Sequence, residues 1–400
     1  MGILHYHRQS SRQNSYREES RHERRWKLWN GIAKETYPAL SLFGYKQKVI
    51  DGPVDFPPIE EVIKAFWGGR NSQKRLFNGQ SNQCLDMSAY AEYFRRQWYI
   101  MASDAVGRYV AAQKVEDIFQ IVQLLVQGEH RDTIVSRLHH ATPTVGESAC
   151  GSSVDLAVRL LLMLKVGIVK HQASPHHCLR WEKGNLQGFV RERFNNPPVL
   201  DCHHVRLHKS FDAWSISTIG GLKVEFTDNL ADHLLLVDDD TTVLLFHHAS
   251  FLECQVKTLY PDGLAEETLR TLALLFPQSE FNCSARGSNN KGEWLQKLCL
   301  ESSPFLIDSR VALCGNLPAE DRQIERFRFW RDRLIILKQV YDDATPKTMQ
   351  QWWHDRRNGE RWFTFWVAVL VLIITITLGL IQCVESTLQV YKAYYPTVVQ

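Results

Sequence analysis

Residues 362–381 read WFTFWVAVLVLIITITLGLI, a run of twenty residues with no charge and no proline. Sixteen of them are apolar or aromatic, and the remaining three threonines and one glycine are compatible with a helix. As an α-helix rising about 1.5 Å per residue, the run would cover roughly 30 Å, the thickness of the hydrocarbon core of a bilayer. The alternative is a buried core helix, but such helices seldom stay apolar on every face for five turns. The run therefore predicts a membrane-spanning helix.

The residues on either side of this run are those expected at a membrane interface. Aromatic rings favour the boundary between lipid and water, and cytosolic flanks are enriched in Arg and Lys. Three arginines lie in the ten residues before Trp362, whereas Lys392 is the only basic residue after the run. This bias predicts a single-pass protein with a cytosolic N-terminal side, and a span of this length suits the membranes of several organelles. The predicted interface residues are Trp352, Trp353, Arg356, Arg357, Arg361, Trp362, Trp366, Tyr391 and Tyr394.

The composition divides the 400 residues into segments. Residues 1–30 carry seven Arg or Lys against three Glu and no apolar run, which predicts a disordered basic arm rather than a signal peptide. Residues 31–55 read as an irregular packed segment, and residues 56–346 as an α-rich cytosolic domain. An aromatic and basic juxtamembrane segment follows at 347–361, then the transmembrane helix at 362–384 and a short tail at 385–400.

Helical periodicity dominates the predicted cytosolic domain. Apolar residues recur at helical spacing in residues 60–67, 87–101, 113–127, 131–140, 154–166, 265–276 and 319–341. Ser152 or Ser153 is expected to cap the helix at 154–166, which is apolar on nearly every face. Residues 222–226, 234–237 and 243–247 read as strands, with a hairpin loop at 238–242. The predicted fold is mainly α, with a small antiparallel β element near residues 222–248.

Four stretches of the chain follow one another in a distinctive order. They are GGLKVEFTDNLADHLLLVDDDTTVLLFHHASFLE (220–253), GLAEETLRTLALLFP (263–277), FRFWRDRLIILKQVYDDATP (327–346) and QWWHDRRNGERWFTFWVAVLVLIITITLGLIQCVESTLQVYKAY (351–394). In this order they resemble a large family of filamentous-fungal proteins with a C-terminal transmembrane helix. The members of that family are uncharacterised and have no assigned activity. The resemblance therefore implies a single-pass membrane protein and transfers no catalytic residue.

Histidine and cysteine residues provide the candidate for a metal site. The nine cysteines are scattered along the chain, which fits reduced thiols rather than a disulfide framework. Zinc prefers four Cys or His ligands in a tetrahedron, and Cys178, Cys202, His204 and His208 could supply them if the chain brings them together. However, no C-x-x-C pair is present, and adjacent histidines also occur at 139–140 and 247–248. Structural or exposed histidines are therefore the simpler interpretation, zinc stays a candidate, and no other cofactor is expected.

Other activities find little support. Residues 146–151, GESACG, approach the G-x-S-x-G elbow of hydrolases, but Cys150 replaces the second glycine and no strand is predicted before them. The helix at 154–166 carries only two cations on an apolar surface, so no nucleic acid is expected as a partner. The favoured interpretation is a non-catalytic cytosolic domain that is held at a lipid bilayer and binds an unknown protein partner. The alternative is a membrane-tethered enzyme with the His/Cys metal site, and no small-molecule substrate is identified.

Overall fold

The computed structural model describes residues 57–68, 86–102, 110–167, 178–195, 197–255, 259–281, 290–301, 306–345, 351 and 359–394. Several predictions fall on other residues and stay predictions. They concern the basic arm, the segment at 31–55 and the interface residues Trp352, Trp353, Arg356 and Arg357. For Arg361 the structure describes the backbone alone.

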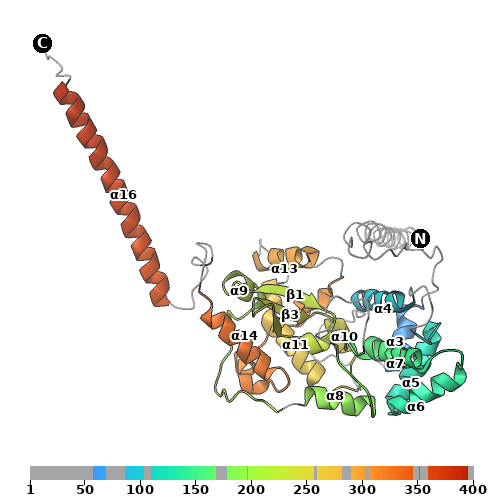
Figure 1. Cartoon of the computed structure of the whole chain (residues 1–400). Helices are drawn as coiled ribbons and strands as arrows, with labels where there is room; N and C mark the ends of the chain where they lie inside the picture. The colour runs from blue at the N-terminus through green and yellow to red at the C-terminus, as the bar shows by residue number, and fades with distance from the viewer. Residues whose placement is uncertain are drawn as a thin grey trace, which may run out of the picture. The chain divides into compact units, whose positions relative to one another are not determined.

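Helices dominate the described residues, as Figure 1 shows. The α-helices are α3 (Ile59–Trp67), α4 (Ser88–Ala102), α5 (Val115–Val126), α6 (Arg131–Ala141), α7 (Glu147–Leu162), α8 (Leu186–Phe194), α9 (Ala213–Thr218), α10 (Ala249–Glu253), α11 (Leu264–Leu275), α12 (Gln278–Phe281), α13 (Asn290–Glu301), α14 (Arg331–Asp343) and α16 (Gly359–Tyr394). Short 3-10 helices are η2 (Leu230–Asp232), η3 (Ser309–Leu313), η4 (Ala319–Arg322) and η5 (Ile324–Arg326). The strands are β1 (Lys223–Thr227), β2 (Leu235–Val237) and β3 (Thr242–Phe246). The predicted fold class, mainly α with a small β element, is confirmed.

The chain divides into two compact units. The first consists of Met1–Pro197, Glu225–His233 and Leu245–Leu317. The second consists of Pro198–Val224, Leu234–Leu244 and Pro318–Gln400. Residues 56–346, which the sequence suggests as one domain, therefore contribute to both units.

Helix α7 forms the centre of the first unit. Helices α4, α5 and α6 all pack against it, and twelve of its sixteen residues are buried. The hydroxyl of Tyr90 in α4 donates a hydrogen bond to the carbonyl of Leu160 at 2.7 Å, and the hydroxyl of Tyr93 donates to the carbonyl of Arg159 at 3.2 Å. These bonds satisfy polar groups that would otherwise be costly in an apolar core. The sequence prediction of a central core helix is thus correct in kind.

The ends of α7 differ from the prediction. The helix begins at Glu147, seven residues before the predicted start, and ends at Leu162 because Met163 adopts a left-handed conformation with φ 48°. Ser153 is not a cap but an interior residue. Its hydroxyl accepts the backbone N–H groups of Ala111 at 2.8 Å and Ala112 at 3.1 Å, and donates to the carbonyl of Ala149. The side chain that was expected to cap the helix therefore forms tertiary hydrogen bonds instead.

The three strands form one small mixed sheet in the order β1-β3-β2. Strands β2 and β3 are antiparallel, with Leu236 opposite Val243, so β1 runs parallel to β3. The predicted hairpin loop is present between β2 and β3, and residues 238–240 all have positive φ, at 54°, 55° and 61°. Aspartate tolerates this left-handed region better than most residues, which explains a run of three in so tight a loop.

In the second unit, the prediction of one long helix at 319–341 is wrong. The segment forms η4, η5 and α14 instead, with extended backbone at Gln323 and Phe327. The backbone N–H of Leu207 donates to the carbonyl of Arg322 at 2.8 Å, and that of Ile324 donates to the carbonyl of Val205 at 2.9 Å. This pairing with residues 205–207 uses backbone groups that a continuous helix would need for itself.

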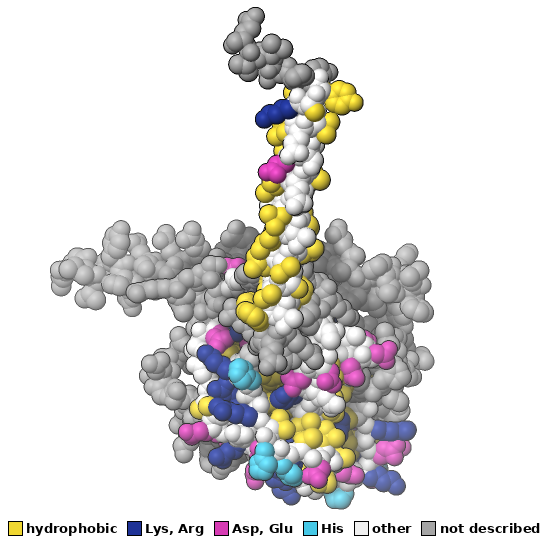
Figure 2. Space-filling model, turned by 90° about the vertical axis from the view of Figure 1, so that its left-hand side faces the viewer, with side chains coloured by type: hydrophobic (Ala, Val, Ile, Leu, Met, Phe, Trp, Pro, Cys, Tyr) yellow, Lys and Arg dark blue, Asp and Glu magenta, His cyan; other side chains and the backbone are white. Residues whose placement is uncertain are grey.

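Helix α16 is the one helix in the described part of the chain that is long and apolar enough to cross a membrane. The apolar segment is Trp362–Tyr394, and none of it is buried. The helix continues without a break past residue 384, so the first ten residues of the predicted tail are helical. Apolar side chains line its surface in Figure 2, and Glu385 and Lys392 are its charged residues after Trp362.

Candidate metal centre

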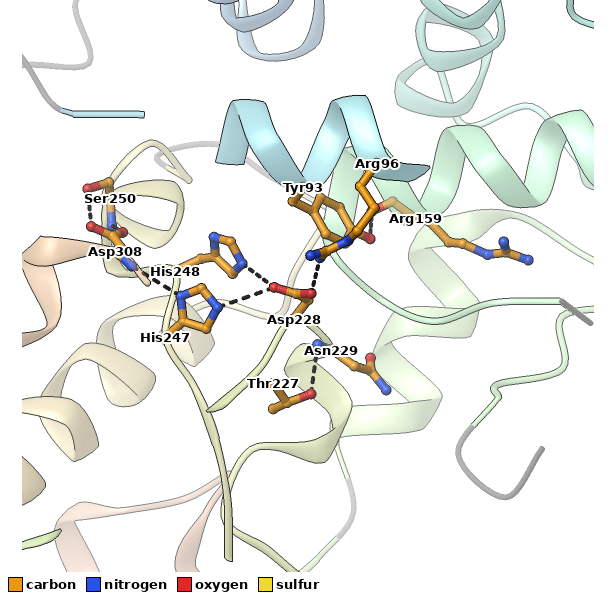
Figure 3. A network of polar contacts seen from close by, with 10 residues as sticks. All are labelled: Tyr93, Arg96, Arg159, Thr227, Asp228, Asn229, His247, His248, Ser250 and Asp308. Atoms are coloured by element: carbon orange, nitrogen blue, oxygen red, sulfur yellow. Dashed lines mark hydrogen bonds and ion pairs between the residues drawn. The ribbon is translucent and has the colours of Figure 1, made fainter. Parts of the chain in front are cut away.

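A polar cluster lies at one edge of the sheet, within the first unit. Asp228 directly follows β1, and His247 and His248 directly follow β3 and precede α10. Because parallel strands end at the same edge of a sheet, the residues that follow β1 and β3 come together. Figure 3 shows that the two imidazole rings and the carboxylate point toward one another.

The carboxylate of Asp228 is the centre of this cluster. Its Oδ1 atom lies 3.2 Å from Nε2 of His247 and 2.7 Å from Nε2 of His248. Its Oδ2 atom accepts a hydrogen bond from the guanidinium of Arg96, which α4 contributes. Both carboxylate oxygens therefore have donors, and the network joins α4, the end of β1 and the start of α10.

The hydrogen bonds assign a proton to each imidazole. Nδ1 of His247 accepts the backbone N–H of Asp308 at 3.3 Å, so Nε2 of this ring carries the proton and donates to Asp228. Nε2 of His248 donates to the same oxygen, which leaves Nδ1 of His248 as an acceptor. This atom is buried and has no hydrogen-bond partner in the part of the chain that the structure describes.

The two histidines are enclosed, whereas the ion pair reaches the surface. His247 and His248 are each 1% exposed, and their rings are tilted by 31° with centroids 3.9 Å apart. The ring of His248 also contacts Tyr93 and Phe246. The side chains of Asp228 and Arg96 are 21% and 19% exposed. Solvent therefore reaches the cluster from the Asp228 and Arg96 side.

This environment sets the protonation of the cluster. Burial alone would raise the pKa of Asp228, but the Arg96 guanidinium and the bonds from both histidines hold that pKa well below 3.8. Burial, together with the neighbouring His247, lowers the pKa of His248 to about 3. At neutral pH the cluster thus contains an ionised Asp228 and a neutral His248. Neutral imidazole and ionised carboxylate are the forms that bind metal ions.

Surrounding residues hold the cluster in place. The carboxylate of Asp308 accepts the backbone N–H of Ser250 at 2.7 Å and the hydroxyl of Ser250 at 3.0 Å, which fixes the beginning of α10 behind the histidines. Asn229 accepts the backbone N–H of Lys165 at 3.0 Å and donates to Asp232 at 2.9 Å, which fixes the turn that carries Asp228. Both supports connect the cluster to buried parts of the first unit.

The structure places the predicted metal ligands elsewhere. Cys178 belongs to the first unit, whereas Cys202, His204 and His208 belong to the second. His204 and His208 are exposed, and His208 is 2.8 Å from the hydroxyl of Ser210 through Nδ1. Among the described residues, Asp228, His247 and His248 form the group whose ligand atoms lie within 4.8 Å of one another. This group includes none of the four predicted ligands. The four-ligand site stays a prediction.

The sequence prediction does not include this cluster, although one signal is present. In the sequence His247 and His248 are one of several adjacent histidine pairs, and Asp228 is not among the predicted ligands. His247 is the last residue of the predicted strand 243–247, and Asp228 lies two residues after the predicted strand 222–226. Polar residues at strand ends come together when the strands are parallel neighbours. The sequence did not indicate that β1 and β3 are such neighbours, because β2 lies between them in the chain.

The hydrolase motif has no support in the described structure. Residues 146–151 lie at the start of α7, and the element before them is helix α6 rather than a strand. A nucleophile elbow requires a sharp turn from strand to helix. Ser148 is instead an exposed residue in the first turn of a helix.

Comparison of the chain with protein-family models, with curated proteins and with solved structures finds no match. The functional argument therefore depends on this chain's own residues, and the resemblance to fungal membrane proteins remains a prediction.

Proposed function

We propose that this chain is a single-pass membrane protein whose N-terminal part forms a non-catalytic interaction domain in the cytosol. The observation that carries the proposal is α16, an apolar helix of which no part is buried in the described structure. The proposed partners are the lipid bilayer and a protein that binds the cytosolic domain. No small-molecule substrate and no nucleic acid are part of this proposal.

The distribution of exposed apolar side chains supports the membrane anchor. Twenty-one large apolar side chains are exposed in the described part of the chain, and sixteen of them lie on α16. Each carries a free-energy cost in water of about 25 cal/mol per Å² of apolar surface, which a lipid environment removes. The polar groups of α16 are also suited to lipid. The hydroxyls of Thr375 and Thr377 donate to the carbonyls of Val371 and Ile373, both at 2.8 Å, within the same helix.

The charge distribution supports the proposed orientation. Three arginines precede the apolar segment within ten residues of Trp362, whereas Lys392 is the basic residue that follows it. Under the positive-inside rule this bias keeps the N-terminal side in the cytosol. The organelle is left open, because several membranes accept a helix of this kind.

The proposal includes no nucleic acid, and the position of Arg159 in the central helix is consistent with this. Arg159 in α7 is 3% exposed, and its Nε atom donates to the carbonyl of Val166 at 2.6 Å. A guanidinium in this position cannot reach a phosphate, whereas a recognition helix must present its cations at the surface.

Extraction and glycosylation experiments test the anchor and its orientation separately. Full-length protein is expected to remain in the membrane pellet at alkaline pH in carbonate, and release into the supernatant would contradict the anchor. Asn282 starts an Asn-Cys-Ser acceptor sequence and is expected to stay without sugar in the cytosol. An acceptor appended after Gln400 is expected to be glycosylated. The reverse pattern would keep the anchor and refute the orientation.

A further inference from the structure

We propose that Asp228, His247 and His248 bind one divalent transition-metal ion, with Zn²⁺ and Fe²⁺ as the cations that fit best. Two imidazole nitrogens and one carboxylate oxygen form a ligand set that these ions accept, whereas Mg²⁺ and Ca²⁺ prefer oxygen ligands throughout. This site does not depend on the membrane anchor, and it differs from the Cys178, Cys202, His204 and His208 set.

The spacing of the ligand atoms suits a cation of this size. Ligands about 2.1 Å from a tetrahedral metal lie about 3.4 Å from one another. Oδ1 of Asp228 is 3.2 Å from Nε2 of His247 and 2.7 Å from Nε2 of His248, and all three atoms lie within 4.8 Å of one another. A cation could thus replace the shared hydrogen bonds with a small outward movement of the two rings. Three protein ligands leave at least one coordination position for water.

The surroundings of Asp228 resemble the outer shell of a metal site. Metal-binding carboxylates are usually hydrogen-bonded on the oxygen that does not face the metal, and Arg96 occupies Oδ2 in this way. Glu92, on the same helix, interacts electrostatically with both Arg96 and Asp228, and burial raises its pKa.

Coordination would change the tautomer of both imidazoles. Because neutral imidazole has one proton, coordination through Nε2 moves that proton to Nδ1 in both rings. In His247 the new Nδ1–H would face the backbone N–H of Asp308, so the present 3.3 Å hydrogen bond is given up. In His248 the proton would sit on the buried Nδ1, which has no hydrogen-bond partner among the described residues. Both changes oppose coordination, and the metal–ligand bonds must outweigh them.

Titration with a metal ion alone tests the proposal. Full-length protein in detergent micelles is stripped with a chelator and titrated with Co²⁺, whose visible spectrum reports ligand number and type, and then with Zn²⁺ as competitor. The expected result is one Co²⁺ per chain, a spectrum without the charge-transfer band of a sulfur ligand, and full displacement by Zn²⁺. A folded protein that binds no stoichiometric Co²⁺ overturns the proposal.

Variants assign the ligands. Asp228→Asn and His248→Ala should each weaken Co²⁺ binding by about 100-fold or more, since even loss of an outer-shell partner costs 10- to 100-fold. His140→Ala removes an exposed histidine from another adjacent pair and should leave the affinity unchanged. The double variant Cys202→Ser and His204→Ala should also bind as the wild type does. Loss of binding in that double variant would transfer the site to the Cys/His set and refute this one.

A spectroscopic measurement keeps the test decisive if a cluster variant fails to fold. X-ray absorption of the zinc-loaded wild type should show nitrogen and oxygen ligands alone, with at least two imidazoles, and a sulfur ligand would overturn the proposal. The anchor proposal is tested by membrane extraction of the same protein. Either proposal can therefore fail without the other.

Discussion

Helices α7 and α16 are both rich in apolar side chains but differ in how far those side chains are buried. Twelve of the sixteen residues in α7 are buried, whereas the segment Trp362–Tyr394 in α16 is not buried at all. Their polar groups explain the difference. Ser153 in α7 forms hydrogen bonds with residues 111 and 112, outside the helix, whereas Thr375 and Thr377 in α16 bond only to carbonyls of their own helix. An apolar helix that satisfies its own polar groups suits lipid, and one that bonds to neighbouring elements belongs to a protein core.

The largest expected effect comes from removing one leucine from α7. Leu160 is 0% exposed, and Leu160→Ala should lower the free energy of unfolding of the first unit by about 2–5 kcal/mol through lost burial and a cavity. Leu372 in α16 is 59% exposed, so the matched variant Leu372→Ala should leave that free energy unchanged. Urea unfolding followed by circular dichroism measures both. Equal effects would mean that the two helices do not differ in environment.

A charge in α16 should reduce membrane insertion without changing the stability of the first unit. Ile374 lies within the apolar run, and Ile374→Arg should oppose membrane insertion by about 3 kcal/mol, the cost of arginine near the centre of a spanning helix. Urea unfolding of the first unit should not change. The fraction inserted is measured by glycosylation of an acceptor appended after Gln400, with Ile374→Leu as control. Unchanged insertion of the arginine variant would count against the anchor.

Acid should weaken the first unit and spare the anchor. In the unfolded chain His248 gains a proton below pH 6.5, whereas the pKa of about 3 in the fold keeps it neutral. The unfolded state therefore binds more protons, and stability falls as the pH drops from 6.5 toward 3. Between pH 7 and pH 5 the expected loss is about 2 kcal/mol.

This pH dependence is measured by urea unfolding at pH 7, 6 and 5 with chelator present. His248→Gln removes the titrating ring and should flatten the profile over this range. A wild type as flat as the variant would show that His248 titrates equally in both states. Membrane retention should be the same at each pH.

The smallest expected change in the free energy of unfolding comes from an exposed ion pair. Lys297 and Glu301 in α13 form a pair one turn apart at 3.6 Å, with side chains 75% and 63% exposed. Lys297→Ala should change the free energy of unfolding by about 0.3 kcal/mol, because water screens exposed pairs. A loss above about 1 kcal/mol would indicate that α13 is more enclosed than its exposure implies. Urea midpoints measured beside Leu160→Ala provide the comparison.

Much of the fold follows from local patterns in the sequence. Residues 113–127 predict α5, and the turn residues at 238–242 between two apolar runs predict the hairpin, because periodicity and turn residues act over a few positions. Prediction from the sequence is wrong where a distant segment forms hydrogen bonds with the backbone groups that a helix would use. Residues 319–341 have helical spacing, yet their backbone pairs with residues 205–207. Local propensity does not contain that information.

The candidate metal centre was hidden for a similar reason. Closeness in the sequence favours Cys202, His204 and His208 as predicted metal ligands. In contrast, β2 and its hairpin separate Asp228 from His247 in the chain. Only the order β1-β3-β2 places the ends of β1 and β3 side by side. Arg96 comes from a still more distant helix, and no pattern in the sequence connects it with Asp228.

The unbroken course of α16 has a mechanical consequence. Its 33 apolar-segment residues span roughly 50 Å at helical rise, which exceeds a hydrocarbon core of about 30 Å. In a bilayer, with its first residues at one boundary, such a helix would extend as a rigid rod roughly 20 Å beyond the other boundary. A rigid extension of this kind would transmit tilt and rotation across the membrane, whereas a flexible tail would not.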